Sequence, residues 1–317
     1  MIQSGAIFRS KTTLTTQIIM AQSILTDLIN REGLPESFQA LAIRWYQPLA
    51  AALVEKRSNA GATVIGVQGS QGSGKSTLAV FLKHYFEEEH GLRSCVLSLD
   101  DFYFGRAERQ KLAATVHPLL QTRGVPGTHE VELAMSVIDQ LQQPARPVRI
   151  PRFDKAVDDR VAYDRWELMQ EPIDFIIFEG WCVGAEPQVE TDLIKPMNAL
   201  EAEEDAAGVW RRYVNNALAG SYQSLFSRCD ALVVLQAPSF ECVYEWRWLQ
   251  EQKLHKQRQA LQADLNSRML DENGVRRFIA HYERLTRHCL LTLPKQADWV
   301  LQLNHEHNIT SATQGGE

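Results

Sequence analysis

The sequence has 317 residues, of which 44% are hydrophobic and 23% are charged. This composition is typical of a folded globular protein and excludes a disordered chain, a collagen and a short disulfide-rich scaffold. The 33 Lys and Arg residues and 39 Asp and Glu residues give a net charge of −6. Such a chain is not attracted as a whole to nucleic acid or to an anionic membrane, so we expect neither as a partner. The apolar runs are also far shorter than the roughly 18 residues of a membrane helix.

The cysteines indicate a reducing compartment. Five are present, an odd number, and no two stand in a C-x-x-C spacing. We therefore expect reduced thiols, no structural zinc site and a cytoplasmic protein. Residues 1–19 are rich in Ser and Thr and contain no acid, which is weakly similar to an organelle transit peptide. We favour instead a start at Met20, with residues 1–19 as a disordered or mis-assigned extension.

Hydrophobic periodicity predicts the elements in chain order. Residues 20–60 form a helical prelude, because apolar residues recur at helical spacing there. Short apolar runs predict five strands, at residues 63–67, 94–99, 173–178, 231–236 and 299–303. Helical patterns cover about residues 78–91, 131–142, 240–261 and 275–290. Strands alternating with helices predict an α/β fold, with a five-stranded parallel sheet and helices on both faces.

A glycine-rich loop follows the first predicted strand and precedes a helix. Its residues match the phosphate-binding pattern G-x-x-x-x-G-K-[ST]: Gly69, Ser70, Gln71, Gly72, Ser73, Gly74, Lys75 and Ser76, with Thr77 next. Glycines let successive backbone N–H groups point at phosphate oxygens, and the following helix N-terminus adds favourable partial charge. We expect residues 69–77 to bind ATP, with Lys75 on its β- and γ-phosphates and Ser76 on Mg²⁺.

Other features narrow the class of nucleotide-binding protein. No N-K-x-D guanine-recognition box follows the loop, which disfavours a GTPase. Motor ATPases and helicases usually end the corresponding apolar strand in Asp and carry basic surfaces. Here this strand ends in Glu179 and the chain is acidic. The sequence therefore favours a small-molecule kinase over a switch or a motor.

Acidic residues stand at the carboxyl ends of two predicted strands. Asp100 and Asp101 follow the second strand, and Glu179 follows the third. Ligands of open parallel sheets bind at this edge, and phosphoryl transfer needs one carboxylate for the attacking proton and another for Mg²⁺ or its waters. We assign the base to Asp100 and the metal side to Glu179 with Ser76. The reverse choice of base stays open, and one of the two aspartates is alternatively a helix cap.

Cationic residues are concentrated between these acids. The segments TRGVPGTHE and IPRFDK supply four expected ligands for a carboxylate or phosphate of the acceptor: Arg123, His129, Arg152 and Lys155. The helix at residues 240–261 carries Arg247, which we expect to close over the triphosphate and act in catalysis. Surface salt bridges are the alternative for these cations, and simple packing is the alternative for Trp246 and Trp248.

Six motifs in this chain resemble those of the D-glycerate 3-kinase family, within the group of uridine kinase, phosphoribulokinase and pantothenate kinase. They are QGSQGSGKST, SLDDFY, RGVPGTHE, IPRFDK, FEGWCVG and YEWRWL, and the resemblance covers about residues 40–308. It implies a P-loop kinase fold with ATP as donor and Mg²⁺, and a small hydroxy acid such as D-glycerate as acceptor. By position, Asp100, Glu179 and Arg247 match the base, the Walker B acid and a lid cation of related kinases.

Two departures from the family pattern lie near the acceptor. Glu130 replaces an Asp that is common after the histidine, and residues 155–166 replace a stretch that is usually rich in Ser and Gly. The predicted activity is ATP-dependent phosphorylation of a small hydroxy acid, with D-glycerate favoured as acceptor and 3-phosphoglycerate as product. The alternatives are a nucleoside or pantothenate kinase, or an ATP-binding regulatory switch. Nothing in the sequence indicates the oligomeric state.

These inferences give one enzyme domain. We expect a P-loop kinase domain at residues 61–308, with acceptor-binding insertions at about residues 101–170 and a lid helix at about residues 240–261. A disordered tail at residues 309–317 follows. The acidic run Glu201 to Asp205 is interpreted as a solvent-exposed face.

Overall fold

The computed structural model describes residues 34–58, 61–143, 147–260 and 270–315, together with residues 26, 29 and 30. The expectations for residues 1–19 lie outside these residues. None of the five cysteines forms a disulfide bond, as the sequence predicts. Among the helices described, none combines the length and the apolar character that crossing a membrane requires.

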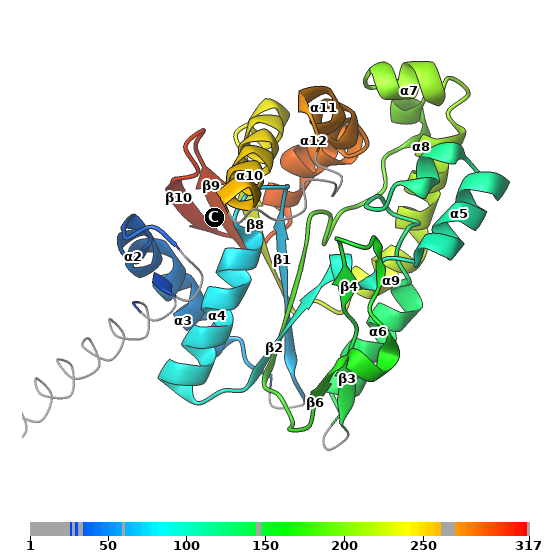
Figure 1. Ribbon diagram of the computed structural model, residues 1–317. Coiled ribbons are helices and arrows are strands. Elements are labelled where there is room, and N and C mark those ends of the chain that lie inside the picture. Colours follow the sequence, from blue (N-terminus) through cyan, green and yellow to red (C-terminus); the bar gives the residue numbers. More distant parts are fainter. Residues whose placement is uncertain are drawn as a thin grey trace, which may run out of the picture.

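A six-stranded sheet runs through the centre of the molecule (Figure 1), in the order β10-β9-β8-β1-β7-β2. Its strands are β1 (Thr63–Gly69), β2 (Ser94–Ser98), β7 (Phe175–Gly180), β8 (Ala231–Gln236), β9 (Trp299–Leu303) and β10 (Ile309–Gln314). The strands β1, β2, β7, β8 and β9 run parallel to one another, which confirms the five predicted parallel strands, and β10 is antiparallel to β9. The central strands β1 and β7 are buried along their whole length, as expected for strands covered on both faces.

The register of the central strands fixes the geometry of the candidate site. Glu179 of β7 lies opposite Val67 of β1 on one side and opposite Ser98 of β2 on the other. The glycine-rich loop after β1 and the Asp100 segment after β2 therefore leave the sheet on either side of Glu179. Because parallel strands end at the same edge, the predicted loop and the predicted acids meet there.

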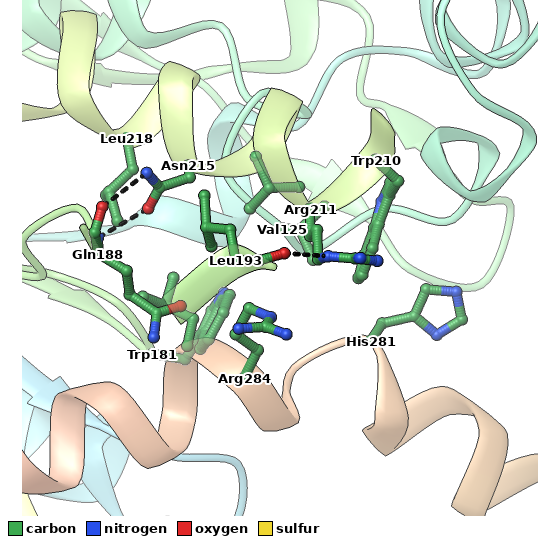
Figure 2. A pocket seen from close by; sticks show the side chains of 12 residues that line it. Val125, Trp181, Gln188, Leu193, Trp210, Arg211, Asn215, Leu218, His281 and Arg284 are labelled. Atoms are coloured by element: carbon green, nitrogen blue, oxygen red, sulfur yellow. Dashed lines mark hydrogen bonds between the residues drawn. The ribbon is translucent and has the colours of Figure 1, made fainter. Parts of the chain in front are cut away.

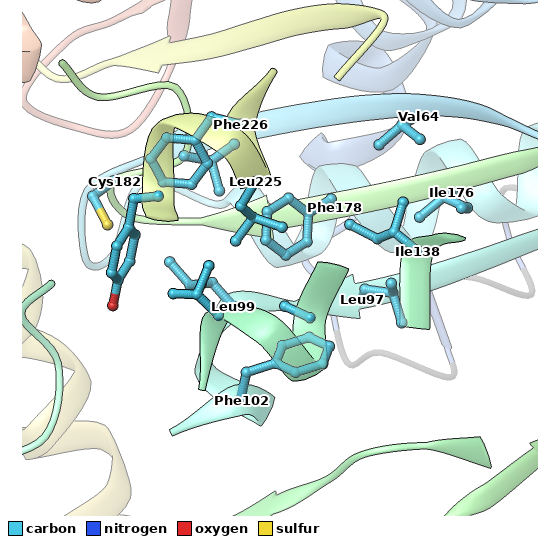
Figure 3. Packing of buried hydrophobic residues seen from close by; sticks show 14 of the residues in the cluster. Val64, Leu97, Leu99, Phe102, Ile138, Ile176, Phe178, Cys182, Leu225 and Phe226 are labelled. Atoms are coloured by element: carbon cyan, nitrogen blue, oxygen red, sulfur yellow. The ribbon is translucent and has the colours of Figure 1, made fainter. Parts of the chain in front are cut away.

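Helices cover both faces of the sheet (Figure 1). One face carries α2 (Ser37–Leu41), the π-helical turn η1 (Ala42–Tyr46), α3 (Gln47–Glu55), α4 (Lys75–His90), α10 (Phe240–Ala260) and α11 (Glu272–Ala280). The other carries α6 (Val131–Leu141), η6 (Leu218–Tyr222), α9 (Gln223–Phe226) and α12 (Glu283–Thr292). Alternate strand residues face the two layers: Ile65 and Ile177 pack on the first, and Val64, Ile176 and Phe178 pack on the second (Figure 3).

Two insertions lengthen the chain between strands. Between β2 and β7 lie η2 (Leu99–Phe102), α5 (Arg106–Thr115), η3 (Pro118–Gln121), α6, the strand pair β3 and β6 (Val148–Ile150 and Glu167–Met169), the hairpin β4–β5 (Phe153–Asp154 and Asp159–Arg160) and η4 (Tyr163–Arg165). Between β7 and β8 lie η5 (Glu190–Leu193), α7 (Ala199–Glu204) and α8 (Val209–Ala217), before η6 and α9. Near the end of the chain, η7 (Leu293–Lys295) precedes β9.

The helix expected at residues 275–290 is divided into α11 and α12. A turn at residues 281–282 separates them. It brings the ring of Tyr282 edge-on to Trp181, with centroids 4.9 Å apart, and its hydroxyl donates to the backbone oxygen of Arg123 at 3.0 Å. These contacts join the C-terminal helices to residues 122–130, which we call the acceptor segment because ligands of the acceptor are expected there.

The acidic run from Glu201 to Asp205 is not wholly solvent-exposed, contrary to expectation. The side chains of Glu201 and Asp205 are buried. Glu201 lies 2.6 Å from Arg284 of α12, and Asp205 lies 3.0 Å from Arg211 of α8. Each carboxylate can be buried because an arginine of another helix compensates its charge.

The prediction of a disordered tail at residues 309–317 is also wrong, because Ile309–Gln314 forms β10. It pairs antiparallel with β9. The turn before it is held by Asn304, whose side chain accepts from the backbone N–H groups of Glu306 and Asn308. An Asn that caps its own turn is a hairpin signal, and Thr and Ser in the run that follows suit an edge strand.

Candidate active site

The glycine-rich loop lies between β1 and α4, at the carboxyl edge of the sheet. Gly72 and Gly74 have φ of +82° and +89°, in the left-handed region that favours glycine. A Cβ at Gly72 would also lie 2.8 Å from the Cβ of Trp246 on α10. The loop conformation therefore requires glycine, and it sets the N-terminus of α4, with its unpaired N–H groups, at the site where an anion binds.

The loop turns polar side-chain atoms inward. Within the described part of the chain, three of its buried atoms have no hydrogen-bond partner: Ser70 Oγ, Gln71 Oε1 and Ser73 Oγ. Close by, Ser76 Oγ donates to Glu179 Oε1 at 3.4 Å, and Lys75 Nζ lies 3.9 Å from Glu179 Oε2. Because burying an unpaired polar atom is unfavourable, these atoms indicate a ligand. Hydroxyls, a lysine and a carboxylate in this arrangement fit nucleotide phosphates with a divalent cation.

Asp100 lies in η2, at the neighbouring strand end. Tyr103 Oη donates to its Oδ1 at 2.6 Å, and Lys155 Nζ donates to its Oδ2 at 2.5 Å. Burial alone would raise the pKa of Asp100, but the charges of Lys155 and Lys75 and the two hydrogen bonds hold that pKa well below its ordinary value. Asp100 is therefore ionised at neutral pH. Since the charge of Lys75 acts on it, the loop lysine and Asp100 share one electrostatic environment.

Asp101, unlike Asp100, is held by hydrogen bonds from the β4–β5 hairpin and its flank. Its Oδ1 accepts from the backbone N–H of Phe153 at 3.0 Å, and its Oδ2 accepts from Arg152 at 3.1 Å. The alternative of a helix cap is wrong for both aspartates, because α5 begins after Gly105 without a side-chain cap. Asp101 anchors the β4–β5 hairpin beside Asp100.

The four expected acceptor ligands are not equally placed. Arg152 is held by Asp101 and, at 2.8 Å, by Glu167, so its cation is neutralised away from Asp100. Lys155 contacts Asp100 directly. Arg152 therefore braces the β4–β5 hairpin, whereas Lys155 lies against Asp100 at the end of β2.

Arg123 is linked through the ring of Phe153 to Tyr103, which donates a hydrogen bond to Asp100. Its guanidinium is 5.5 Å from the ring centroid of Phe153, and the ring of Tyr103 packs edge-on to the same ring at 5.3 Å. Arg123 pairs with Asp158, which has φ of +59°. The carboxylate of Asp158 also forms an ion pair with the buried Arg109 at 3.0 Å, and its backbone oxygen accepts a hydrogen bond from Arg109 at 2.7 Å. The single carboxylate of Asp158 therefore pairs with two guanidinium groups, those of Arg123 and Arg109.

His129 is buried beside Asp100. Its ring stacks on Tyr103 with centroids 4.5 Å apart, and its Nδ1 lies 2.6 Å from Tyr222 Oη. Burial lowers the pKa of His129 to about 3, although Asp100 acts in the opposite direction, so the ring is uncharged. The next residue, Glu130, pairs with Arg160 of the hairpin at 2.5 Å.

Arg247 lies near the start of α10, next to Trp246. It pairs with Glu251 at 2.6 Å, and its charge also acts on Tyr282. Trp246 packs on the glycine-rich loop, stacks on His307 with centroids 4.0 Å apart, and donates from Nε1 to the backbone oxygen of His305 at 2.8 Å. The start of α10 is thus fixed to both the loop and the β9–β10 turn.

Sequence reasoning missed three residues of this region. Tyr103 stands inside the quoted motif SLDDFY, so its proximity to Asp100 could have identified it. For Trp246, the structure shows the packing that the sequence offered as an alternative. Asp158 and Tyr222 carry no local signal, because their partners lie 35 and 93 residues away.

A small cavity lies behind the acceptor segment (Figure 2). Its volume is about 20 Å³, and its lining includes Val125, Trp181, Trp210 and His281. Within the described residues, Trp210 Nε1 and His281 Nε2 have no hydrogen-bond partner. A cavity of this size accommodates a water molecule, whereas small-molecule sites occupy several hundred Å³. It is therefore not the acceptor site.

Comparison with known proteins identifies relatives among kinases. No protein-family model matches the chain. The chain is 35% identical over 229 residues to the uncharacterized kinase mug58 of Schizosaccharomyces pombe, covering 69% of this chain and 78% of that protein. It is 30% identical over 211 residues to the chloroplastic D-glycerate 3-kinase of Arabidopsis thaliana, covering 63% of this chain and 43% of that protein.

Solved structures agree on the fold. The D-glycerate 3-kinase of Cryptococcus neoformans superposes with a TM-score of 0.67 at 24% identity, covering 85% of this chain and 98% of that one. The mostly parallel sheet flanked by helices is the P-loop kinase fold that the loop and the alternation of strands and helices predict. The chain is a P-loop kinase and belongs to the D-glycerate 3-kinase family.

Proposed function

We propose that the protein transfers the γ-phosphoryl group of ATP to a hydroxyl of a small hydroxy acid, with D-glycerate as acceptor and 3-phosphoglycerate as product. The observation that carries the proposal is the position of Asp100. It is an ionised carboxylate at a strand end, the charge of the phosphate-loop lysine acts on it, and Lys155 contacts it directly. A D-glycerate 3-kinase among the relatives supports the same acceptor.

The donor side is assigned to the glycine-rich loop. Residues 69–77 would hold the triphosphate by backbone N–H groups, and Lys75 would contact its β- and γ-phosphates. Ser76 donates a hydrogen bond to Glu179 at the end of β7, and these two residues would hold Mg²⁺. When bound, Mg²⁺ neutralises charge on the phosphates. The closeness of Glu179 to Ser76 and Lys75 supports its metal-side role and leaves Asp100 as the base.

On the acceptor side, Asp100 would accept the proton of the attacking hydroxyl. Its Oδ2 is occupied by Lys155, whose side chain is 60% exposed. A lysine so exposed moves at little cost, so Lys155 can exchange Asp100 for the acceptor or the transferred group. Arg123 would hold the acceptor carboxylate in a charge-assisted contact. His129 would contribute a neutral donor, and Arg152 would act by bracing the hairpin.

The same proposal includes a lid role for α10 and the bounds of the kinase domain in the sequence. Arg247 would reach the transferring phosphoryl group only after releasing Glu251, because the two are paired at 2.6 Å. The domain of residues 61–308, with insertions at residues 101–170, would be completed by β10. We propose the cytoplasm as its location.

The test is phosphorylation of a panel of acceptors by the purified full-length chain. With ATP and Mg²⁺, D-glycerate should yield phosphoglycerate, whereas uridine and pantothenate should yield no product. The Lys75→Ala variant should retain its fold and lose this activity. Hydrolysis of ATP that no acceptor accelerates would favour the regulatory switch, and phosphorylation of uridine or pantothenate alone would replace the acceptor proposed here.

A further inference from the structure

The backbone around His129 is paired with the segment that carries Asp100. The N–H of Glu130 donates to the oxygen of Phe102 at 2.7 Å, and the N–H of Phe104 donates to the oxygen of Thr128 at 2.9 Å. His129 is thereby fixed opposite Tyr103, which donates to Asp100. The ring of His129 is part of the same rigid unit as the proposed base.

The contacts of Tyr222 determine which nitrogen of His129 carries the proton. The backbone N–H of Gly127 donates to Tyr222 Oη at 3.0 Å, so this oxygen already accepts one hydrogen bond. Among the described residues, the ring of His129 is the acceptor that lies against the Tyr222 hydroxyl, and this hydroxyl is too buried to donate to bulk water. The Tyr222 O–H must therefore donate to Nδ1 of His129, 2.6 Å away. The proton of the neutral ring is left on Nε2.

The Nε2–H donor of His129 has no partner among the described residues. The side chain is only 2% exposed, so bulk water does not supply one. The titratable groups that face the ring are Asp100, Tyr103 and Tyr222. Burial keeps the ring uncharged despite Asp100. A buried donor left over in a cluster built around a proposed base indicates that a ligand provides the missing acceptor atom.

We propose that Tyr222 is a positioning residue that fixes His129 as its neutral Nε2–H tautomer, and that Nε2–H donates to an oxygen of the acceptor beside Asp100. This inference rests on the proposed function for the identity of that oxygen, which belongs to a hydroxy acid. A neutral donor orients the acceptor without adding a cation next to Asp100. A protonated imidazole would pair with the carboxylate and reduce its ability to take the hydroxyl proton.

The tautomer can be measured without any substrate. In ¹⁵N-labelled full-length protein, the ring nitrogens of His129, assigned with His129→Gln, should show an unprotonated Nδ1 and a protonated Nε2. In Tyr222→Phe this preference should be lost. Tyr213→Phe is the matched control, because Tyr213 Oη also contacts the same loop, at the backbone oxygen of Gly127, yet does not touch His129. It should leave the spectrum of His129 unchanged.

Kinetics test the donation to the acceptor. Tyr222→Phe should raise the acceptor KM about tenfold and leave the ATP KM unchanged, and Tyr213→Phe should change neither. His129→Gln retains a donor near the position of Nε2 and should keep more activity than His129→Asn. The inference is overturned if wild-type His129 carries its proton on Nδ1 or on both nitrogens, or if Tyr213→Phe raises the acceptor KM as much as Tyr222→Phe. The spectrum decides the tautomer even if the acceptor panel refutes the proposed kinase activity on hydroxy acids.

Discussion

Replacing Arg123 by Met removes one cation from the proposed acceptor site while keeping its surroundings. Met has a comparable length and can retain the apolar contact with the ring of Phe153. The backbone oxygen of residue 123 still accepts from Tyr282, and Asp158 still pairs with the buried Arg109 at 3.0 Å. The acceptor segment should therefore keep its fold in Arg123→Met.

The size of the effect follows from two opposing contributions. A hydrogen bond to a charged group contributes about 1.5–3 kcal/mol. Before it binds the acceptor, Arg123 must release Asp158, and their side chains are 25% and 24% exposed. A pair with that access to solvent is worth about 0.2–1 kcal/mol. The net loss of acceptor binding is then about 1–2 kcal/mol, which raises the acceptor KM roughly 5- to 30-fold.

Initial rates of ADP release, measured against acceptor and against ATP, separate the possible results. Arg123→Met should raise the acceptor KM in this range and leave the ATP KM unchanged. Arg276→Met is the control, because Arg276 is a cation of α11 paired with Glu272 at the surface. An unchanged acceptor KM in Arg123→Met would refute the assignment. A matching rise in the ATP KM would show instead that the substitution disturbs the whole site.

Three further predictions concern other carboxylates. Glu201→Gln deprives the buried Arg284 of its counter-charge and should lower the free energy of unfolding by about 3–5 kcal/mol in denaturant titrations, whereas Glu272→Gln at the surface should have a far smaller effect. Glu179→Gln should lower kcat by at least about tenfold and increase the Mg²⁺ concentration needed for half-maximal rate; an unchanged Mg²⁺ requirement would contradict its metal-side role. Because the pKa of Asp100 is held low, its base form persists above that pKa, and kcat/KM should show no acid limb above about pH 5. A limb near pH 6–7 that is absent in Asp100→Asn would contradict this.

The sheet and the phosphate-binding loop could be predicted because their signals are local. Each parallel strand is a short apolar run bounded by polar residues or glycine, and the loop pattern lies within eight consecutive residues. Strand β10 was not predicted because its sequence, ITSATQ, is mostly polar, as is common for a strand at the edge of a sheet. Its pairing depends on the Asn304 turn and on β9, and the apolar content of the strand itself does not reveal it.

Pairings between distant residues could not be predicted. Glu201 is buried because its carboxylate pairs with Arg284, which lies on α12, 83 residues away in the sequence. The sequence identified Arg123 and Lys155 as cations near the acids, but it could not show which carboxylate each one meets. Charge is a local property of the sequence, whereas the partner that determines whether the charge is free depends on the fold.

The pairing of Arg123 with Asp158 would explain how the proposed acceptor site, which is rich in cations, stays folded and could still prefer an acid. A guanidinium left unpaired in a partly buried place is costly, so the chain supplies its own carboxylate when no acceptor is present. An acceptor that carries a carboxylate replaces Asp158 with little net change in the charge around Arg123. A neutral acceptor, such as a nucleoside, would have to leave the pair intact or separate it without replacing the lost contact. In the proposed site, this arrangement would favour hydroxy acids over neutral alcohols. Because Arg123 has no carboxylate to release in an Asp158→Asn variant, the ratio of kcat/KM for glycerate to that for glycerol should rise, and a lower ratio would contradict the proposed role of Arg123.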